Sequence, residues 1–170
     1  MNSQEAKIIA EFLFPQIEQE AQITRKVLAA VPQDACQYTP DPKSMTALKL
    51  AAHIATVDVW FLESVANGAF AEPEPSIETN LKTPADVLAY FDKNFGPALA
   101  KAKEVPAEKL AEVVSFYTFS FPAVVYLNFL IKHSVHHRGQ LSAYLRPMGA
   151  KVPSIYGGSA DEPMEAAAQA

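Results

Sequence analysis

The stretch KHSVHHRGQLSAYLR, residues 132–146, contains three of the four histidines of this 170-residue chain. His133, His136 and His137 fall within five positions, directly after a strongly apolar segment, and apolar residues continue among them. The sequence RPMG at its end is typical of a helix terminus, because proline cannot continue the helix. The pattern therefore predicts a buried helix over residues 121–146 that carries the three imidazoles.

The spacing of these histidines favours one pair as ligands of a metal ion. Residues four apart on a helix lie about 40° apart around its axis, with Cβ atoms about 6 Å from each other, so His133 and His137 can bind one ion. His136 is rotated by about 100° from His137 and must have another role. The fourth histidine, His53, lies in a separate apolar stretch and can supply a third imidazole from a facing helix.

Such a set of residues has two competing interpretations. Three neutral imidazoles with an open fourth position are typical of a catalytic Zn²⁺ site, and Ni²⁺, Fe²⁺ or Mn²⁺ would also accept them. Histidine pairs four residues apart also occur by chance, and a lone histidine on an apolar face is usually a hydrogen-bonded core residue. The spacing alone leaves both a divalent metal site and ordinary core histidines open, and it identifies no catalytic side chain.

Hydrophobic periodicity predicts three further helices, over residues 3–31, 46–66 and 83–103. Ser3 is the expected N-cap of the first helix, whose apolar face includes Ile8 and Phe12. Pro15 is expected to kink that helix or to mark its true start, and Pro97 is expected to break the third.

The segments between these helices predict loops. Residues 31–46 and 69–83 are rich in proline, and a short amphipathic piece over residues 107–116 leads into the last helix. Pro122 with its preceding serine is interpreted as a helix start. No stretch alternates convincingly over more than four residues, so no strand is predicted.

Together these elements predict an all-α fold, a four-helix bundle in one domain that covers residues 1–170. An ordered C-terminal tail is expected over about residues 147–163, followed by a solvated end. Charged residues make up only 19% of the chain, which suggests that some apolar surface is covered by a partner, and we expect a homodimer formed through helix faces.

Composition and charge exclude several kinds of partner. The net charge is -5 and there is no basic cluster, so nucleic acid and anionic membranes are poor candidates. Residues 113–131 contain no charge, but polar residues and Pro122 interrupt the run, which favours a buried helix over a membrane span. A single cysteine excludes an internal disulfide, and the N-terminus lacks the basic region of a signal peptide. We therefore expect a cytoplasmic protein.

The motif HSVHHRGQLSAYLRPMGAKVPSIYG, residues 133–157, closely resembles the C-terminal signature of the DinB-like (damage-inducible) proteins. The upstream stretch LAAVPQDACQYTPDPKSMTALKLAAHIATVDVWFLESVANG, residues 28–68, resembles their N-terminal half. The resemblance implies a four-helix bundle, often a homodimer, with a divalent metal ion held by three histidines. The upstream histidine of the family corresponds to His53, and its His-x-x-x-His pair corresponds to His133 and His137.

The resemblance also suggests a chemistry. Characterised relatives include S-transferases that use bacillithiol, mycothiol or glutathione, and mycothiol-dependent isomerases. We therefore expect a metal-dependent transferase that activates a low-molecular-weight thiol and acts on a small-molecule substrate. The alternatives are a metal-dependent hydrolase and a non-catalytic, stress-related metal-binding bundle.

The distribution of acidic residues favours thiol transfer over hydrolysis. There is no Asp or Glu between Glu112 and Asp161, and Ser134 and Val135 stand where a zincin helix has its glutamate base. Hydrolysis would more often need such a base, which we expect only from Glu18 and Glu20 on the first helix or from Asp161 and Glu162 in the tail.

Three residues are weaker candidates for substrate binding. Tyr126 and Gln140 lie on the histidine face of the last helix, and Trp60 lies two turns after His53. Core packing is the competing interpretation for each of them. Arg138 is expected either to bind a substrate carboxylate or to point into solvent.

Overall fold

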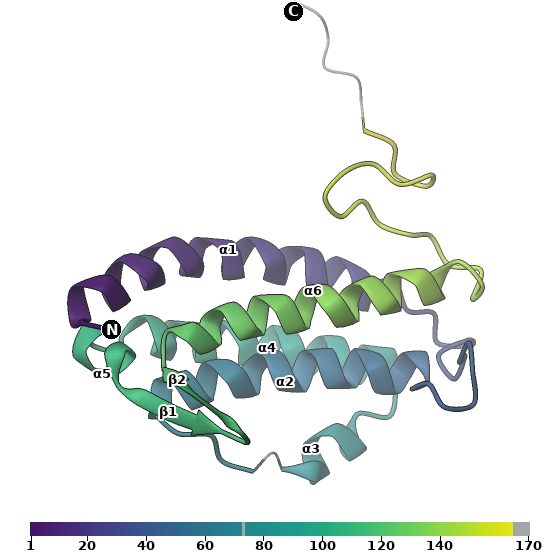
Figure 1. Ribbon diagram of the computed structural model, residues 1–170. Helices are drawn as coiled ribbons and strands as arrows, with labels where there is room; N and C mark the ends of the chain where they lie inside the picture. Colours follow the sequence, from purple (N-terminus) through teal and green to yellow (C-terminus); the bar gives the residue numbers. More distant parts are fainter. Residues whose placement is uncertain (73, 165–170) are drawn as a thin grey trace, which may run out of the picture.

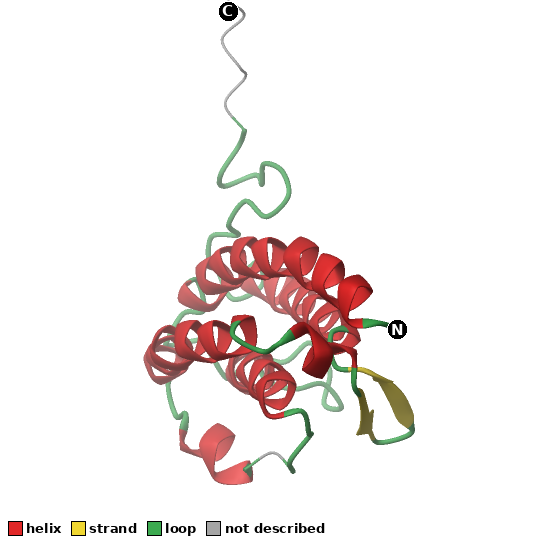
Figure 2. Ribbon diagram, turned by 90° about the vertical axis from the view of Figure 1, so that its left-hand side faces the viewer, coloured by secondary structure: helices red, strands yellow, loops and turns green. Residues whose placement is uncertain are grey.

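Four long helices pack side by side in the computed structural model, which describes residues 1–72 and 74–164 (Figures 1 and 2). They are α1 (Ser3–Ala29), α2 (Ala47–Asn67), α4 (Pro84–Lys103) and α6 (Val125–Leu145). Helix α2 packs on α4 and α6, and α1 packs on α6 and α4, so the core lies between all four. The predicted all-α bundle is confirmed. Residues 165–170, included in the predicted domain, lie outside the described part.

Helix α1 begins at Ser3, as predicted, ends two residues before the predicted end, and runs through Pro15. Asn2, not Ser3, is the N-cap, and it forms a capping box with Glu5. The expected apolar face is wrong at two positions, because Ile8 and Phe12 are 57% and 70% exposed. The stripe that faces the core contains small alanines together with larger residues: Ala6, Ala10, Leu13, Phe14 and Ile17.

Helices α2 and α4 have the ends that their sequences predict. Thr46 caps α2, which ends at Gly68 in the left-handed conformation that glycine adopts without steric cost. Thr83 and Asp86 form a capping box at the start of α4. Pro97 does not break α4, which continues to Lys103.

The prediction that the chain contains no strand is wrong for a short hairpin. Strands β1 (Val113–Phe116) and β2 (Phe119–Pro122) pair antiparallel, with Val113 opposite Pro122 and Phe116 opposite Phe119. Pro122 therefore ends a strand and does not start a helix, and α6 begins at Val125. Each strand has only four residues, too few for alternation to be recognised.

Two short helices complete the described chain. Helix α5 (Ala107–Ala111) precedes the hairpin, and α3 (Pro75–Asn80) lies in a segment predicted as a loop. Figure 1 shows α3 beside α2, beneath the bundle. No helix in residues 1–72 or 74–164 has the length and apolar character of a membrane span.

The chain after α6 is held by its own acidic side chains. The backbone N–H of Val152 donates to the Asp161 carboxylate, and that of Ser154 donates to the Glu162 carboxylate. Both hydrogen bonds are 2.8 Å long. Both carboxylates are therefore engaged within this segment. Neither contacts a histidine, contrary to the expectation that the tail could supply a base for the site.

Candidate metal centre

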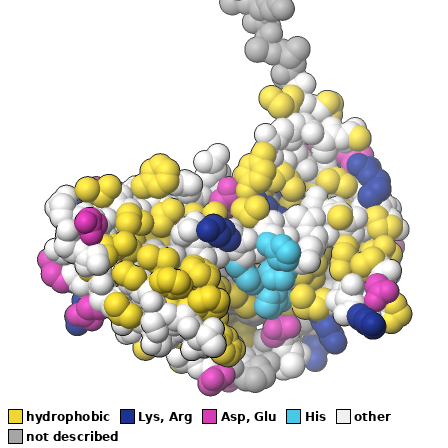
Figure 3. Space-filling model, in the orientation of Figure 1, with side chains coloured by type: hydrophobic (Ala, Val, Ile, Leu, Met, Phe, Trp, Pro, Cys, Tyr) yellow, Lys and Arg dark blue, Asp and Glu magenta, His cyan; other side chains and the backbone are white. Residues whose placement is uncertain are grey.

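The packing of α2 against α6 brings three of the four histidines together. His53 lies on α2, and His133 and His137 lie one turn apart on α6; the three ring centroids are 4.5 to 5.0 Å apart. One nitrogen from each ring can be chosen so that all three lie within 4.8 Å of one another. Figure 3 shows the histidines gathered near the middle of one face of the molecule. All three rings are half-buried.

The distance between two of these nitrogens fits a shared ion. Nε2 of His53 lies 3.0 Å from Nε2 of His133. With metal–nitrogen bonds of about 2.1 Å, two ligands are about 3.0 Å apart at a right angle and about 3.4 Å apart at a tetrahedral angle. Within residues 1–72 and 74–164, these histidines are the one group of His, Cys, Asp or Glu residues that converges in this way.

The other nitrogen of each α6 histidine has an acceptor of its own. Nδ1 of His133 lies 3.3 Å from Oδ1 of Asp58, and Nδ1 of His137 lies 2.8 Å from Oε1 of Gln140. A carboxylate or amide oxygen accepts, so each Nδ1 carries the proton and each Nε2 keeps its lone pair. Metal-binding histidines commonly have such partners, which fix the tautomer and the ring orientation. The donor set therefore fits a divalent ion.

Asp58 is the residue that the sequence analysis missed. Its side chain is 1% exposed, and burial raises its pKa, although hydrogen bonds from His133 and Ser134 act in the opposite direction. The acids expected near the site lie on α1 and in the tail, whereas the acid beside the histidines lies on α2. The signal in the sequence is the position of this aspartate between Val57 and Val59 in an apolar helix. A buried carboxylate needs a hydrogen-bond or charge partner, which a neighbouring helix must supply.

The surroundings keep two of the imidazoles neutral. Burial, followed by the neighbouring His133 and His137, lowers the pKa of His53 from 6.5 to about 4. Burial is also the largest cause that lowers the pKa of His137. Because only a neutral imidazole has a lone pair for a metal ion, both side chains are ready to bind one at neutral pH.

Behind the histidines, Arg138 anchors a buried polar network, contrary to the prediction that it binds substrate or faces solvent. It is 1% exposed, forms an ion pair with Glu20 and donates to Thr24 on α1. Thr24 is hydrogen-bonded in turn to Ser134 over 3.0 Å. The hydroxyl of Tyr156 donates to the same Glu20 carboxylate. Glu20 is thus occupied and is not a base for the metal centre.

The remaining candidates lie in different environments. His136 is exposed, its ring at 4.8 Å from that of His137. Tyr126, a predicted substrate residue, is fully buried and donates to the carbonyl of Val114, so it is a core residue. Gln140 is exposed and contacts His137, and Trp60 is half-buried and donates to the carbonyl of Ala71.

A cavity of about 580 Å³ adjoins the histidine cluster. His53 and Trp60 of α2, Tyr90 of α4 and Ile77 of α3 are among its lining residues, so His53 belongs to both the cluster and the cavity. Its size is in the range of small-molecule sites. One histidine of the cluster therefore borders a space large enough for a small molecule.

Comparisons with known proteins agree with this architecture. The model of the DinB family matches residues 2–167. Among curated proteins of Bacillus subtilis (strain 168), the chain is 27% identical to the uncharacterized protein YrdA over 147 residues, covering 85% of this chain and 86% of that protein. It is 26% identical to the uncharacterized protein YjoA over 148 residues, covering 86% of this chain and 92% of that protein.

Two crystal structures share the fold. One is a DinB-like protein, YjoA, from Bacillus subtilis, with a TM-score of 0.69 and 22% identity over 85% of this chain and 96% of that one. The other is a DinB-like protein from Bacillus cereus ATCC 10987, with a TM-score of 0.65 and 25% identity over 86% of this chain and 97% of that one. Both likenesses extend over nearly the whole of the solved chains.

Proposed function

The chain belongs to the DinB family, and on this premise we propose that it is a metal-dependent transferase that activates a low-molecular-weight thiol. His53, His133 and His137 would hold a divalent ion, Zn²⁺, Ni²⁺, Fe²⁺ or Mn²⁺. The observation that carries the proposal is that His53 both joins the histidine cluster and lines the cavity of about 580 Å³. A purely structural site would be closed, whereas a catalytic site keeps an accessible position.

The protein's own residues would prepare this site for a small substrate. Asp58 and Gln140 hold the rings of His133 and His137 through Nδ1, which leaves Nε2 of each ring for an ion, and Nε2 of His133 faces His53. A divalent ion with three neutral ligands keeps its full charge and lowers the pKa of a thiol or water that binds to it. Trp60 and Tyr90 would form the walls that position the substrate.

A metal-dependent hydrolase is the second candidate, and one observation favours it. Glu63 and Glu78 line the same cavity as His53, so a carboxylate could accept a proton from water there. Asp58 is less suited to that role, because it contacts Nδ1 of His133, on the opposite edge of the ring from Nε2. Dependence of the reaction on added thiol distinguishes the two candidates.

The test begins with the metal content of the protein purified from its own host, followed by a thiol-consumption screen with small electrophiles. We expect about one divalent ion per chain and thiol consumption that a chelator abolishes. His53→Ala should lose both, whereas His136→Ala, a matched substitution at an exposed ring, should keep both. Metal binding without any thiol consumption across the screen would favour the non-catalytic bundle.

We further propose that residues 1–170 act as one domain in the cytoplasm. The only cysteine, Cys36, is buried as a free thiol, which is consistent with a reducing compartment. Measuring the fraction of the protein in the cytoplasm and membranes of its host tests the location.

A further inference from the structure

The cavity beside His53 has an uneven distribution of charge. Its described lining residues include four carboxylates, Glu63, Glu72, Glu74 and Glu78, and neither lysine nor arginine. Two aromatic residues, Trp60 and Tyr90, also line it. Carboxylates and aromatic rings together attract an organic cation, the carboxylates by charge and the rings through their electron-rich faces.

The same carboxylates do not form a second metal site. Among the described residues, the three histidines are the one group of potential ligands whose atoms converge on a point. The glutamates come from α2, from the segment before α3 and from α3 itself, so they are spread around the cavity. A dispersed negative field suits an extended organic molecule better than a compact metal ion.

The residues of α2 that line the cavity extend along the helix away from His53. His53, Trp60 and Glu63 all line the cavity. At about 1.5 Å per residue, Trp60 lies about 10 Å and Glu63 about 15 Å along the helix from His53. A ligand with one end at the histidines would therefore have its other end near the tryptophan and the glutamate.

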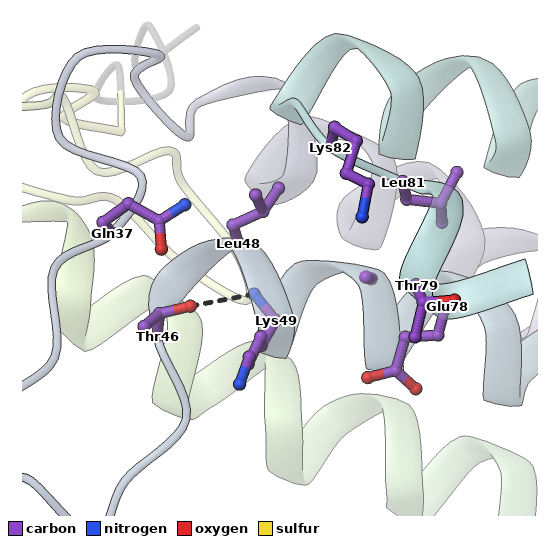
Figure 4. Close-up of a pocket in the computed structure, with 9 residues that line it drawn as sticks. Gln37, Thr46, Leu48, Lys49, Glu78, Thr79, Leu81 and Lys82 are labelled. Carbon is purple, nitrogen blue, oxygen red and sulfur yellow. Dashed lines mark hydrogen bonds between the residues drawn. The ribbon is translucent and has the colours of Figure 1, made fainter. Parts of the chain in front are cut away.

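A second cavity on the same side of α2 has a different character. It has a volume of about 290 Å³ and is lined by Lys49 and Lys82, with Glu78 shared between the two cavities (Figure 4). Figure 4 shows the ammonium group of Lys82 directed into this space. None of the described residues that line it is a histidine. An anionic group would therefore favour this second cavity over the one beside His53.

We propose that the cavity beside His53 binds a small organic ammonium group, and that the thiol used by this protein is an aminothiol. The sulfur would face the three histidines, and the ammonium group would lie between Trp60, Tyr90 and the glutamates. The thiol part rests on the proposed function, whereas the ammonium site depends only on residues of the cavity.

The ammonium site can be tested in the metal-free protein. Trp60 is the only tryptophan, so its fluorescence reports on the cavity. We expect n-butylammonium to change this fluorescence in a saturable manner, with a Kd at least tenfold lower than that of butyrate. The double variant Glu63→Gln/Glu72→Gln should weaken n-butylammonium binding at least threefold, and Glu11→Gln, on the exposed face of α1, should leave it unchanged. Equal affinities for n-butylammonium and butyrate would overturn the proposal.

A matched series of thiols tests the remaining part in metal-loaded protein. The probes are 6-aminohexanethiol, 6-mercaptohexanol and 6-mercaptohexanoate, which have the same chain and differ in terminal charge. We expect Kd to rise in that order, with at least a tenfold difference between the first and the last. Equal binding of all three would overturn the aminothiol assignment and leave the proposed function standing. If no thiol binds while n-butylammonium still does, the thiol function fails and the ammonium site stands.

Discussion

The two ring nitrogens of His133 face different partners. Nε2 faces His53, and Nδ1 faces the buried Asp58. Asp58→Ala removes the acceptor that fixes the tautomer of this ring, so we expect the affinity for the divalent ion to fall about 10- to 100-fold. Asp58→Asn keeps an acceptor oxygen and should cost less. Competition with a chromogenic chelator measures both variants, and an unchanged affinity in Asp58→Ala would show that the contact does not support the site.

His53 predicts how the metal-free protein responds to acid. Its pKa falls from 6.5 to about 4 in the folded chain, mainly through burial. The unfolded chain therefore binds more protons between these two values, and the free energy of unfolding should decrease as the pH falls from about 6.5 to about 4. Urea denaturation across this range should give a smaller decrease for His53→Gln than for the wild type. If the free energy of unfolding fell equally with pH in both proteins, the lowered pKa of His53 would not be the cause.

The sequence predicted some of these residues and not others, for a physical reason. Helical spacing identifies residues that share one face, and it therefore pairs His133 with His137 and separates His136 from them. Spacing does not reveal which side chains meet across two helices. The contact between Asp58 and His133, and the burial of Arg138 against Glu20, depend on the packing of α2 and α1 against α6.

At the scale of elements, Arg138 joins α6 to α1. Its side chain is fully buried and pairs with Glu20, which is itself largely buried. Arg138→Met leaves this carboxylate without its cation, and we expect a loss of about 3–5 kcal/mol in the free energy of unfolding. Lys132→Met, an exposed site on the same helix, should change it by less than about 0.5 kcal/mol. Similar losses in chemical denaturation of the two variants would contradict this role.

The mispredicted elements share another cause, which is ambiguity in local hydrophobicity. Helix α1 carries two apolar stripes, and the one built around Ala6 and Ala10 faces the core because small residues let helices approach closely. The apolar run over residues 113–122 predicts helix and forms a hairpin, because strands of four residues are too short for alternation to be recognised. The capping residues of α2 and α4 were predictable because capping depends on adjacent positions only.

At the scale of the whole molecule, exposed apolar side chains support a homodimer. Ile8 and Phe12 on α1 and Val113, Tyr117 and Phe119 in the hairpin are exposed. Figure 3 shows many hydrophobic side chains on the half of the visible face to the left of the histidines. Exposed apolar surface of this kind is often an interface between subunits. At micromolar concentration we expect sedimentation to give twice the 18.5 kDa of one chain. A single 18.5 kDa species would contradict a dimer.

If His53, His133 and His137 hold a divalent ion that links α2 to α6, removing this ion should destabilise the fold. The melting temperature of protein first verified to be metal-loaded, measured at about pH 7.5 with and without a chelator, tests it most directly. An ion present at 100 times its Kd stabilises the folded chain by about 2.7 kcal/mol. Removing the ion should therefore lower the melting temperature by about 5–10 °C. We expect that decrease in the wild type and none in His53→Ala. A melting curve of the wild type that the chelator leaves unmoved would contradict the claim.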